Sequence, residues 1–368
     1  MRKRELKNIE WSIGIIAIIL CIIGLVALFS ATKEAEYDEF NKQCIWLVIS
    51  LIIGIIILMI DYEVLVKTSP IFYGAFIILL FAVLFTKPVN GATSWFDIGF
   101  FSLQPGEFAK IFVVLFLTYA ITKIQARDKR NINKPLKLLI LLAILGLPVL
   151  LIIKQPDYGT AAAFIVSMIF MLITAGIDKK YIIGGILLVV ISVPLIYNFI
   201  LPDHAKKRID IFLNPESDPR GSGYNIIQSK LAIGAGGLTG MGILKGNQTQ
   251  LGFLYPKTTD FIFAVIGEEM GFIIAGGIII LYVLLITKCL YVAKTAKDEM
   301  GSLIASGITG IFVFHMIENI GMVMGLLPIT GVPLPFISYG GSSLITNFIC
   351  IAILLNISSK RQKTIFVK

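Results

Sequence analysis

The feature of this sequence that most constrains its fold is a series of apolar runs, each about twenty residues long. A helix of that length crosses ~30 Å of hydrocarbon. Because 57% of the 368 residues are hydrophobic and only 15% are charged, we predict an all-α, polytopic integral membrane protein. About ten transmembrane helices are expected, near residues 10–30, 44–61, 70–86, 104–124, 137–153, 159–176, 181–200, 260–287, 302–326 and 341–358.

Basic residues flank alternate ends of these runs. The segment MRKRELK precedes the first run, KIQARDKRNINKPLK follows the fourth, and SSKRQK follows the last. Because basic connections stay on the cytoplasmic side, we predict that both termini are cytoplasmic. The net charge of +9 is explained by such segments next to anionic lipid, so no nucleic-acid partner is expected.

The chain, residues 1–368, is interpreted as one membrane domain with a single long connection. This connection, residues 201–259, is predicted to form a large outer loop between the seventh and eighth spans. Within it, YNIIQSKLAIG is expected to form a short amphipathic helix along the membrane surface. The stretch GAGGLTGMG lacks the ending of a P-loop, so tight turns and close backbone approach are expected rather than a nucleotide site.

Charged residues within the spans should pair, face water or be neutralised, because each is costly in lipid. Glu107 and Lys110 are three residues apart and can face one another, either as a packing ion pair or as the lining of a polar cavity. Glu268 and Glu269 are adjacent and therefore point about 100° apart. One is expected to face the bundle interior and the other to pair with a base such as Lys110.

A second buried polar site is expected on the ninth span, where Glu318 and Asn319 occur in FHMIENIGMVMG. His315 in the same stretch is interpreted as a satisfied buried histidine rather than a metal ligand. The four cysteines show neither a disulfide framework nor a zinc-site spacing.

Asp260, in TTDFIFAVIGEEMGF, lies at the outer mouth of the eighth predicted span. A partly desolvated carboxylate at such a place can accept a proton from a substrate hydroxyl. Aspartate is also among the best helix N-caps. The residues alone favour a helix cap over a catalytic base.

Five ordered stretches resemble the SEDS family (shape, elongation, division and sporulation) of polytopic peptidoglycan polymerases. They are NGATSWFDIGFFSLQPGEFAKI, QPDYGTAAAF, FLNPESDPRGSGYNIIQSKLAIGAGGLTGMG, TTDFIFAVIGEEMGF and NIGMVMGLLPITGVPLPFISYGGSS. The resemblance spans nearly the whole chain and is closer to RodA-type members than to FtsW-type ones. It implies ten spans with a large loop between the seventh and eighth, and a role in cell elongation and shape; a division or sporulation role of the FtsW or SpoVE type is the alternative.

The resemblance places the family's essential acid on Asp260, which replaces the cap interpretation. It also places an intramembrane acid and base on Glu107 and Lys110. The chain departs from the family pattern at Ser94, where members commonly have a basic residue before the tryptophan. It departs again at YPKT, where many members have an acid and a histidine.

The implied reaction is glycosyl transfer from lipid II at the outer face of the cytoplasmic membrane, with Asp260 as general base. Glu107, Lys110, Glu268 and Glu269 would form a supporting polar cavity. The candidates for substrate binding are Trp95, Gln155, Asp157, Lys206, Lys207, Arg208, Gln228, Ser229, Lys230, Ser338 and Tyr339. No cofactor is firmly implied, although a divalent cation, Mg²⁺ or Mn²⁺, is compatible with a pyrophosphate leaving group.

The expected partners are lipid II, the nascent glycan and membrane lipid. A class B penicillin-binding protein, the transpeptidase, is implied as a partner by the resemblance only. The rival function is a lipid II flippase or transporter, because buried acids and helices interrupted by proline and glycine suit that class too. A scaffold that only recruits a transpeptidase is a third alternative.

Overall fold

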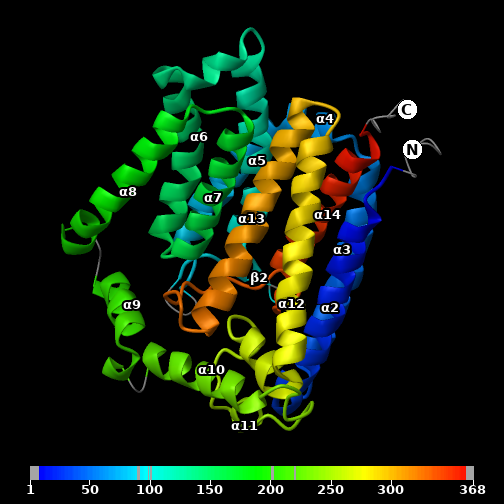
Figure 1. Cartoon of the computed structure of the whole chain (residues 1–368), viewed down its shortest axis with the longest axis vertical. Helices are drawn as coiled ribbons and strands as arrows, with labels where there is room; N and C mark the ends of the chain where they lie inside the picture. Colours follow the sequence, from blue (N-terminus) through cyan, green and yellow to red (C-terminus); the bar gives the residue numbers. More distant parts are fainter. Residues whose placement is uncertain are drawn as a thin grey trace.

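Ten long helices form a bundle in the part of the chain that the computed structural model describes (Figure 1). The structure describes residues 8–88, 92–97, 99, 102–199, 203–218 and 221–361. The long helices are α2 (Trp11–Ala31), α3 (Asp38–Met59), α4 (Tyr62–Ala82), α5 (Pro105–Gln125), α6 (Pro135–Lys154), α7 (Tyr158–Thr174), α8 (Lys179–Phe199), α12 (Ile262–Thr295), α13 (Glu299–Val323) and α14 (Gly341–Ser359). They overlap the predicted spans, although α4 begins eight residues earlier than predicted and α12 ends eight residues later. The all-α, polytopic prediction is confirmed.

Within the described residues, eight of these helices are long and apolar enough to cross a membrane. The other two are α5, which carries Glu107 and Lys110, and α7, which has 17 residues. The count of ten spans and the cytoplasmic termini therefore stay predictions. Some predictions include residues that lie outside the described part of the chain. The predicted seventh span includes residue 200, and the predicted outer loop includes residues 201–202 and 219–220. The single domain also includes residues 1–7 and 362–368.

Short elements complete the described chain at both ends of the bundle. The outer loop contains α9 (Asp203–Leu213), η4 (Pro215–Ser217), α10 (Ser222–Gly236) and α11 (Asn247–Gln250), and the 3-10 helices elsewhere are η1 (Lys33–Ala35), η2 (Val83–Phe85) and η3 (Lys129–Asn133). Strands β1 (Phe96–Asp97) and β2 (Ser102–Leu103) pair antiparallel between α4 and α5. The helix predicted over YNIIQSKLAIG is confirmed as part of α10.

The centre of the bundle is formed by α13 and α14, whose apolar windows are 67% and 83% buried. Helix α8 has no buried residue in its window and lies at the edge of the bundle (Figure 1). In a membrane, residues exposed on such peripheral helices contact lipid rather than water. The polar groups that a reaction needs are therefore expected near α13 and α14 rather than on the periphery.

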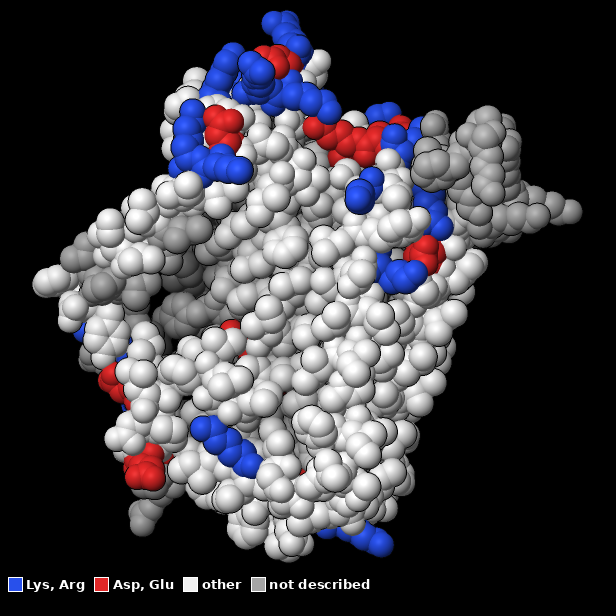
Figure 2. All heavy atoms as spheres, in the orientation of Figure 1, with Lys and Arg blue, Asp and Glu red and all other residues white. Residues whose placement is uncertain are grey.

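Both described chain ends lie at the same end of the bundle as the connection between α5 and α6 (Figure 1). Lys and Arg side chains gather there on the face drawn in Figure 2, whereas the opposite end of that face shows few charges. The positive-inside rule predicts this pattern for a cytoplasmic end. We call the other end of the bundle the distal end.

Helix α12 is interrupted at Gly271, whose φ of 76° is not helical. The interruption leaves the carbonyls of Glu268 and Glu269 available, and they accept hydrogen bonds from Met241 N (2.9 Å) and Gly242 N (3.0 Å). Non-helical backbone at membrane depth is tolerated where protein satisfies its polar groups. The outer loop thus replaces hydrogen bonds that the broken helix lacks.

The outer loop also accepts a hydrogen bond from the residue that follows the break at Gly271. Phe272 N donates to Gly237 O at 2.9 Å. A Cβ on Gly236 would stand 1.9 Å from Gly267 O, so only glycine permits this approach. The tight backbone approach predicted for GAGGLTGMG is confirmed.

Candidate active site

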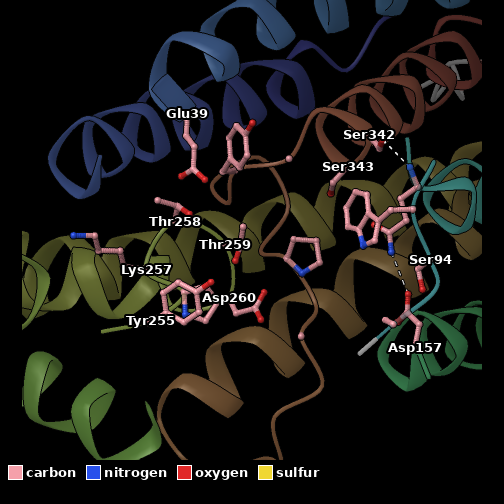
Figure 3. Close-up of a pocket in the computed structure, with 18 of the residues that line it drawn as sticks. Glu39, Ser94, Asp157, Tyr255, Lys257, Thr258, Thr259, Asp260, Ser342 and Ser343 are labelled. Atoms are coloured by element: carbon pink, nitrogen blue, oxygen red, sulfur yellow. Dashed lines mark hydrogen bonds between the residues drawn. The ribbon is translucent and has the colours of Figure 1, made fainter. Parts of the chain in front are cut away.

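A cavity of about 580 Å³ opens at the distal end of the bundle. Its walls come from the connections between α2 and α3, α4 and α5, α6 and α7, and α13 and α14, together with residues 255–260, which we call the strap. Charged and aromatic residues of these segments line it (Figure 3): Glu39, Trp95, Asp157, Tyr255, Lys257, Asp260 and Tyr339. Segments far apart in the sequence therefore contribute polar groups to one space.

The strap is held by the carbonyls of its last three residues. The carbonyls of residues 258–260 accept, in order, from Tyr339 N (3.0 Å), Ser338 Oγ (2.7 Å) and Asn319 Nδ2 (3.0 Å). These donors belong to α13 and to the connection between α13 and α14. The backbone of Asp260 is thereby fixed, and its side chain points into the cavity (Figure 3).

Asp260 is not the N-cap of α12. The helix begins at Ile262, and its N-cap is Phe261, which has no side-chain capping hydrogen bond. The structural alternative that the residues alone favoured is therefore wrong. The carboxylate is instead placed at the wall of a cavity, as a group that acts on a ligand requires.

Asp157 faces the cavity from the wall opposite Asp260 (Figure 3). Its Oδ1 accepts from Thr160 N at 3.0 Å, which caps α7, and its Oδ2 accepts from Gln104 Nε2 at 3.1 Å. Burial raises the pKa of this carboxyl above its ordinary value, and the hydrogen bond from Thr160 N opposes that shift. The two walls thus carry carboxyl groups in different environments. Asp157 is hydrogen-bonded by two donors at the start of α7, whereas the Asp260 side chain points into the cavity.

The predicted ion pair of α5 is confirmed and extends to α13. Lys110 Nζ lies 2.8 Å from Glu107 Oε1 and 2.9 Å from His315 Nε2, and all three residues are at most 2% exposed. The Lys110 ammonium can only donate hydrogen bonds, so His315 Nε2 must accept one and Nδ1 must carry the ring proton. Nδ1 then donates to Pro333 O at 3.0 Å, and Pro333 lines the cavity.

His315 is therefore a satisfied buried histidine, as predicted. Its position between Lys110 and Pro333 was not foreseen, because the spacing within α5 carries no information about α13. Glu318, on the same helix, accepts from Thr330 Oγ1 at 2.8 Å, and Thr330 lines the cavity.

Glu268 and Glu269 lie away from the Lys110 cluster, and the predicted pairing with Lys110 is wrong. Glu268 accepts from the N–H and the hydroxyl of Thr249 (3.0 and 2.7 Å), and Glu269 accepts from Gln250 Nε2 (3.0 Å). Both carboxylates are at most 1% exposed. They hold the outer loop in place and do not line the cavity.

Gln155 and Ser338 also support the walls rather than line the cavity. Gln155 donates to Leu80 O at 3.0 Å, and its carbonyl accepts from Ser94 Oγ at 3.5 Å. Ser338 holds the strap, as described above. Trp95 and Tyr339, in contrast, do line the cavity as candidates for substrate contact.

The outer-loop candidates with described side chains lie outside the cavity lining: Lys206, Lys207, Gln228, Ser229 and Lys230. Lys207 pairs with Asp218 at 3.5 Å. Ser229 is buried and donates to Val323 O at 2.8 Å, which ties α10 to the end of α13. The side chain of Arg208 lies outside the described part of the structure.

Lys257, which the sequence reasoning missed, is the one cation among the described residues that line the cavity. Its Nζ donates to Thr249 O at 2.8 Å and lies 3.1 Å from Glu34 Oε2. The signal was present in YPKT, where the chain departs from the family pattern. Glu39, from the first turn of α3, is a second missed lining residue.

A resident metal centre does not fit the residues that the structure describes. Among them, no three His, Cys, Asp or Glu side chains converge closely enough to hold a metal ion. Mg²⁺ that binds together with substrate phosphates needs only one or two protein carboxylates, so the divalent cation expected with the pyrophosphate stays a prediction.

The fold and cavity define a polytopic membrane protein with an acidic site at one end of its bundle. The family model for FtsW, RodA and SpoVE, described as "Cell cycle protein", matches residues 10–363. The chain belongs to this family.

Two curated relatives and one solved structure illustrate the similarity. Peptidoglycan glycosyltransferase MrdB of Escherichia coli K12 is 36% identical over 350 residues, covering 95% of this chain and 93% of the relative. Stage V sporulation protein E of Bacillus subtilis 168 is 36% identical over 363 residues, with 94% and 95% covered. A structure described as "Structural coordination of polymerization and crosslinking by a peptidoglycan synthase complex" matches with a TM-score of 0.83 and 26% identity, covering 95% of this chain and 97% of the other.

Proposed function

We propose that this protein is a peptidoglycan glycosyltransferase that polymerises lipid II at the outer face of the cytoplasmic membrane. The observation that carries the proposal is Asp260, whose backbone carbonyl is held by Asn319 and whose carboxylate faces a cavity at the distal end. A lipid-linked sugar can reach such a cavity while its polyprenyl tail stays in the bilayer. Membership of a family that includes named peptidoglycan glycosyltransferases supports the same reaction.

In the proposed reaction, Asp260 takes the proton of the acceptor sugar's 4-hydroxyl. The oxygen forms a bond to the anomeric carbon of the donor glycan, and the bond from that carbon to the phosphate oxygen breaks. Undecaprenyl pyrophosphate leaves with the bonding electron pair. General base catalysis of this kind contributes about 10²–10⁴ in rate.

Lys257 is proposed as the group that stabilises the leaving pyrophosphate. Its present partner, the Glu34 carboxylate, has a side chain that is 56% exposed, and exposed ion pairs contribute roughly 0–1 kcal/mol. A phosphate oxygen offers a charge-assisted hydrogen bond instead. In a displacement the attacking and leaving oxygens lie on opposite sides of the carbon, so a cation directed away from Asp260, as in Figure 3, suits the leaving side.

The buried chain from Glu107 through Lys110 and His315 is proposed to position the cavity wall. It ends at Pro333 O, and Pro333 lies two residues beyond Gly331, where an added Cβ would be 3.5 Å from Asp260 Oδ2. Fixing this wall fixes the space in which the two sugars meet, which lowers the entropic cost of their alignment.

Cell elongation is the proposed process, with a class B penicillin-binding protein as the crosslinking partner. The matched structure, described as coordinating polymerization and crosslinking, supports a partner of this kind. The RodA-type wording of the sequence motifs supports elongation over division or sporulation.

The test is polymerisation of lipid II by the purified full-length protein, followed on a gel. We expect Asp260→Asn to lose about 100-fold or more of the wild-type rate. Asp210→Asn is the matched control and should polymerise normally, because Asp210, in α9 of the outer loop, accepts a hydrogen bond from Tyr197 of α8 outside the cavity. Normal polymerisation by Asp260→Asn would refute the base assignment, and flipping of fluorescent lipid II in liposomes without polymerisation would favour a transporter.

A further inference from the structure

A second cavity, of about 400 Å³, lies between α2, α3 and α14, on the side of the bundle away from α8 (Figure 1). We call it the side groove. Every residue that lines it is apolar or glycine, including Trp11, Gly14, Gly54, Phe348 and Leu355. It shares no lining residue with the candidate active site.

The side groove has the depth of one membrane leaflet. It runs along α2 from Trp11 to Ile19 and along α3 from Leu51 to Leu58, about 12 Å at 1.5 Å per residue. Half of the ~30 Å hydrocarbon core is ~15 Å. The groove starts at Trp11, the first residue of α2, beside the chain termini, and Trp11 is half exposed, as is typical of residues at the headgroup level.

The groove ends within one leaflet, whereas a transmembrane helix of a partner protein would run through both leaflets. Its floor is lowered at Gly14 and Gly54, where an added Cβ would meet only ordinary contacts at 3.7 Å. An occupant confined to one leaflet, such as a single acyl chain, matches this shape.

The mouth of the groove carries positive charge. Glu10, next to Trp11, is bonded by both Lys288 Nζ (3.0 Å) and Arg361 Nη1 (3.0 Å), so two cations surround one carboxylate. A phosphate headgroup at this level gains from the excess charge, whereas a neutral headgroup does not.

We propose that the side groove binds one acyl chain of an anionic phospholipid from the leaflet on the side of the termini, with its headgroup at the Glu10, Lys288 and Arg361 cluster. Depth and charge select this occupant over a transmembrane helix of a partner protein. The proposal concerns a different face from the active site and does not depend on the reaction.

The first test is photocrosslinking of the full-length protein in nanodiscs of equal dioleoylphosphatidylglycerol and dioleoylphosphatidylcholine. p-Benzoylphenylalanine replaces Ile15, which lines the groove, or Ile71, an exposed residue of α4 outside it. From position 15 we expect about fivefold more adduct with the anionic lipid, and from position 71 equal adducts. Equal adducts at both positions, or a protein adduct from position 15 in cell membranes, would overturn the proposal.

The second test fills the groove and counts bound lipid by native mass spectrometry. Gly14→Leu places a side chain in the groove, and Gly74→Leu makes the same change on α4, where an added Cβ meets nothing within 4 Å. The wild type and Gly74→Leu should retain phosphatidylglycerol over phosphatidylcholine by about fivefold, and Gly14→Leu should lose that preference. An unchanged preference in Gly14→Leu would place the lipid elsewhere.

Discussion

At the scale of single residues, the environment of Lys257 decides whether it can serve a substrate. Its side chain is 16% exposed, whereas the side chain of its acidic partner Glu34 is 56% exposed. Lys257→Ala should therefore reduce kcat/KM for lipid II by about 10- to 150-fold, because a hydrogen bond between charged groups contributes ~1.5–3 kcal/mol. Steady-state polymerisation rates measure this effect.

Lys257→Arg should keep most of the rate, because it keeps the charge. Lys245→Ala is the control, since Lys245 is exposed in the outer loop and does not line the cavity. A similar loss in Lys245→Ala would show that general charge on the loop, and not the cavity cation, is responsible.

The buried charges of α5 lead to a stability prediction. Lys110→Met leaves Glu107 without its ammonium partner at 1% exposure, and breaking a buried pair in this way costs about 3–5 kcal/mol. The double variant Glu107→Gln with Lys110→Met removes both charges and should be more stable than the single variant. Thermal unfolding in one detergent compares the three proteins, and a double variant less stable than Lys110→Met would contradict the buried-charge explanation.

At the scale of elements, the break in α12 and the loop inserted beside it act as one unit. Gly236→Ala should destabilise the protein by about 1–3 kcal/mol, as overpacking does, because its Cβ would stand 1.9 Å from Gly267 O. Gly234→Ala is a matched control two residues away in α10, where an added Cβ meets nothing within 4 Å. Thermal unfolding should separate the two variants, and equal melting temperatures would show that the loop adjusts without cost.

Sequence patterns predicted the elements better than their contacts. Apolar runs located the helices because the length of a span is set by the bilayer, and a three-residue spacing located the ion pair because helix geometry is local. The partners of Glu268 and Glu269 come from a loop about twenty residues earlier, and no local periodicity encodes that return. The break at Gly271 was missed because neighbouring glycines, Gly267, Gly276 and Gly277, give the same signal in sequence.

The residues of the candidate active site also differ in how well the sequence predicted them. Asp260 was assigned through a motif that is continuous in sequence. Lys257 and Glu39 line the same cavity, yet they come from positions where the chain departs from the family pattern or where no motif was recognised. The outer-loop lysines Lys206, Lys207 and Lys230 were chosen for their charge and their place in the loop, and none of them lines the cavity. Charge in a loop therefore does not by itself define a site.

At the scale of the whole molecule, one orientation must satisfy both the charge distribution and the reaction. Basic connections gather at the end with the termini (Figure 2), and the cavity opens at the other. A sugar polymer made outside the cell requires the cavity end to face outward, and the positive-inside rule requires the basic end to face inward. The two requirements agree on the same direction.

Cysteine labelling of intact cells tests this orientation. In a Cys44→Ser background, Lys245→Cys in the outer loop should react with a charged, membrane-impermeant maleimide. Arg130→Cys, in η3 between α5 and α6, should react only after the membrane is permeabilised. The remaining native cysteines are buried and supply the unlabelled baseline. Labelling of position 130 in intact cells, with protection of position 245, would place the cavity in the cytoplasm, where no glycan strand of the wall can be extended.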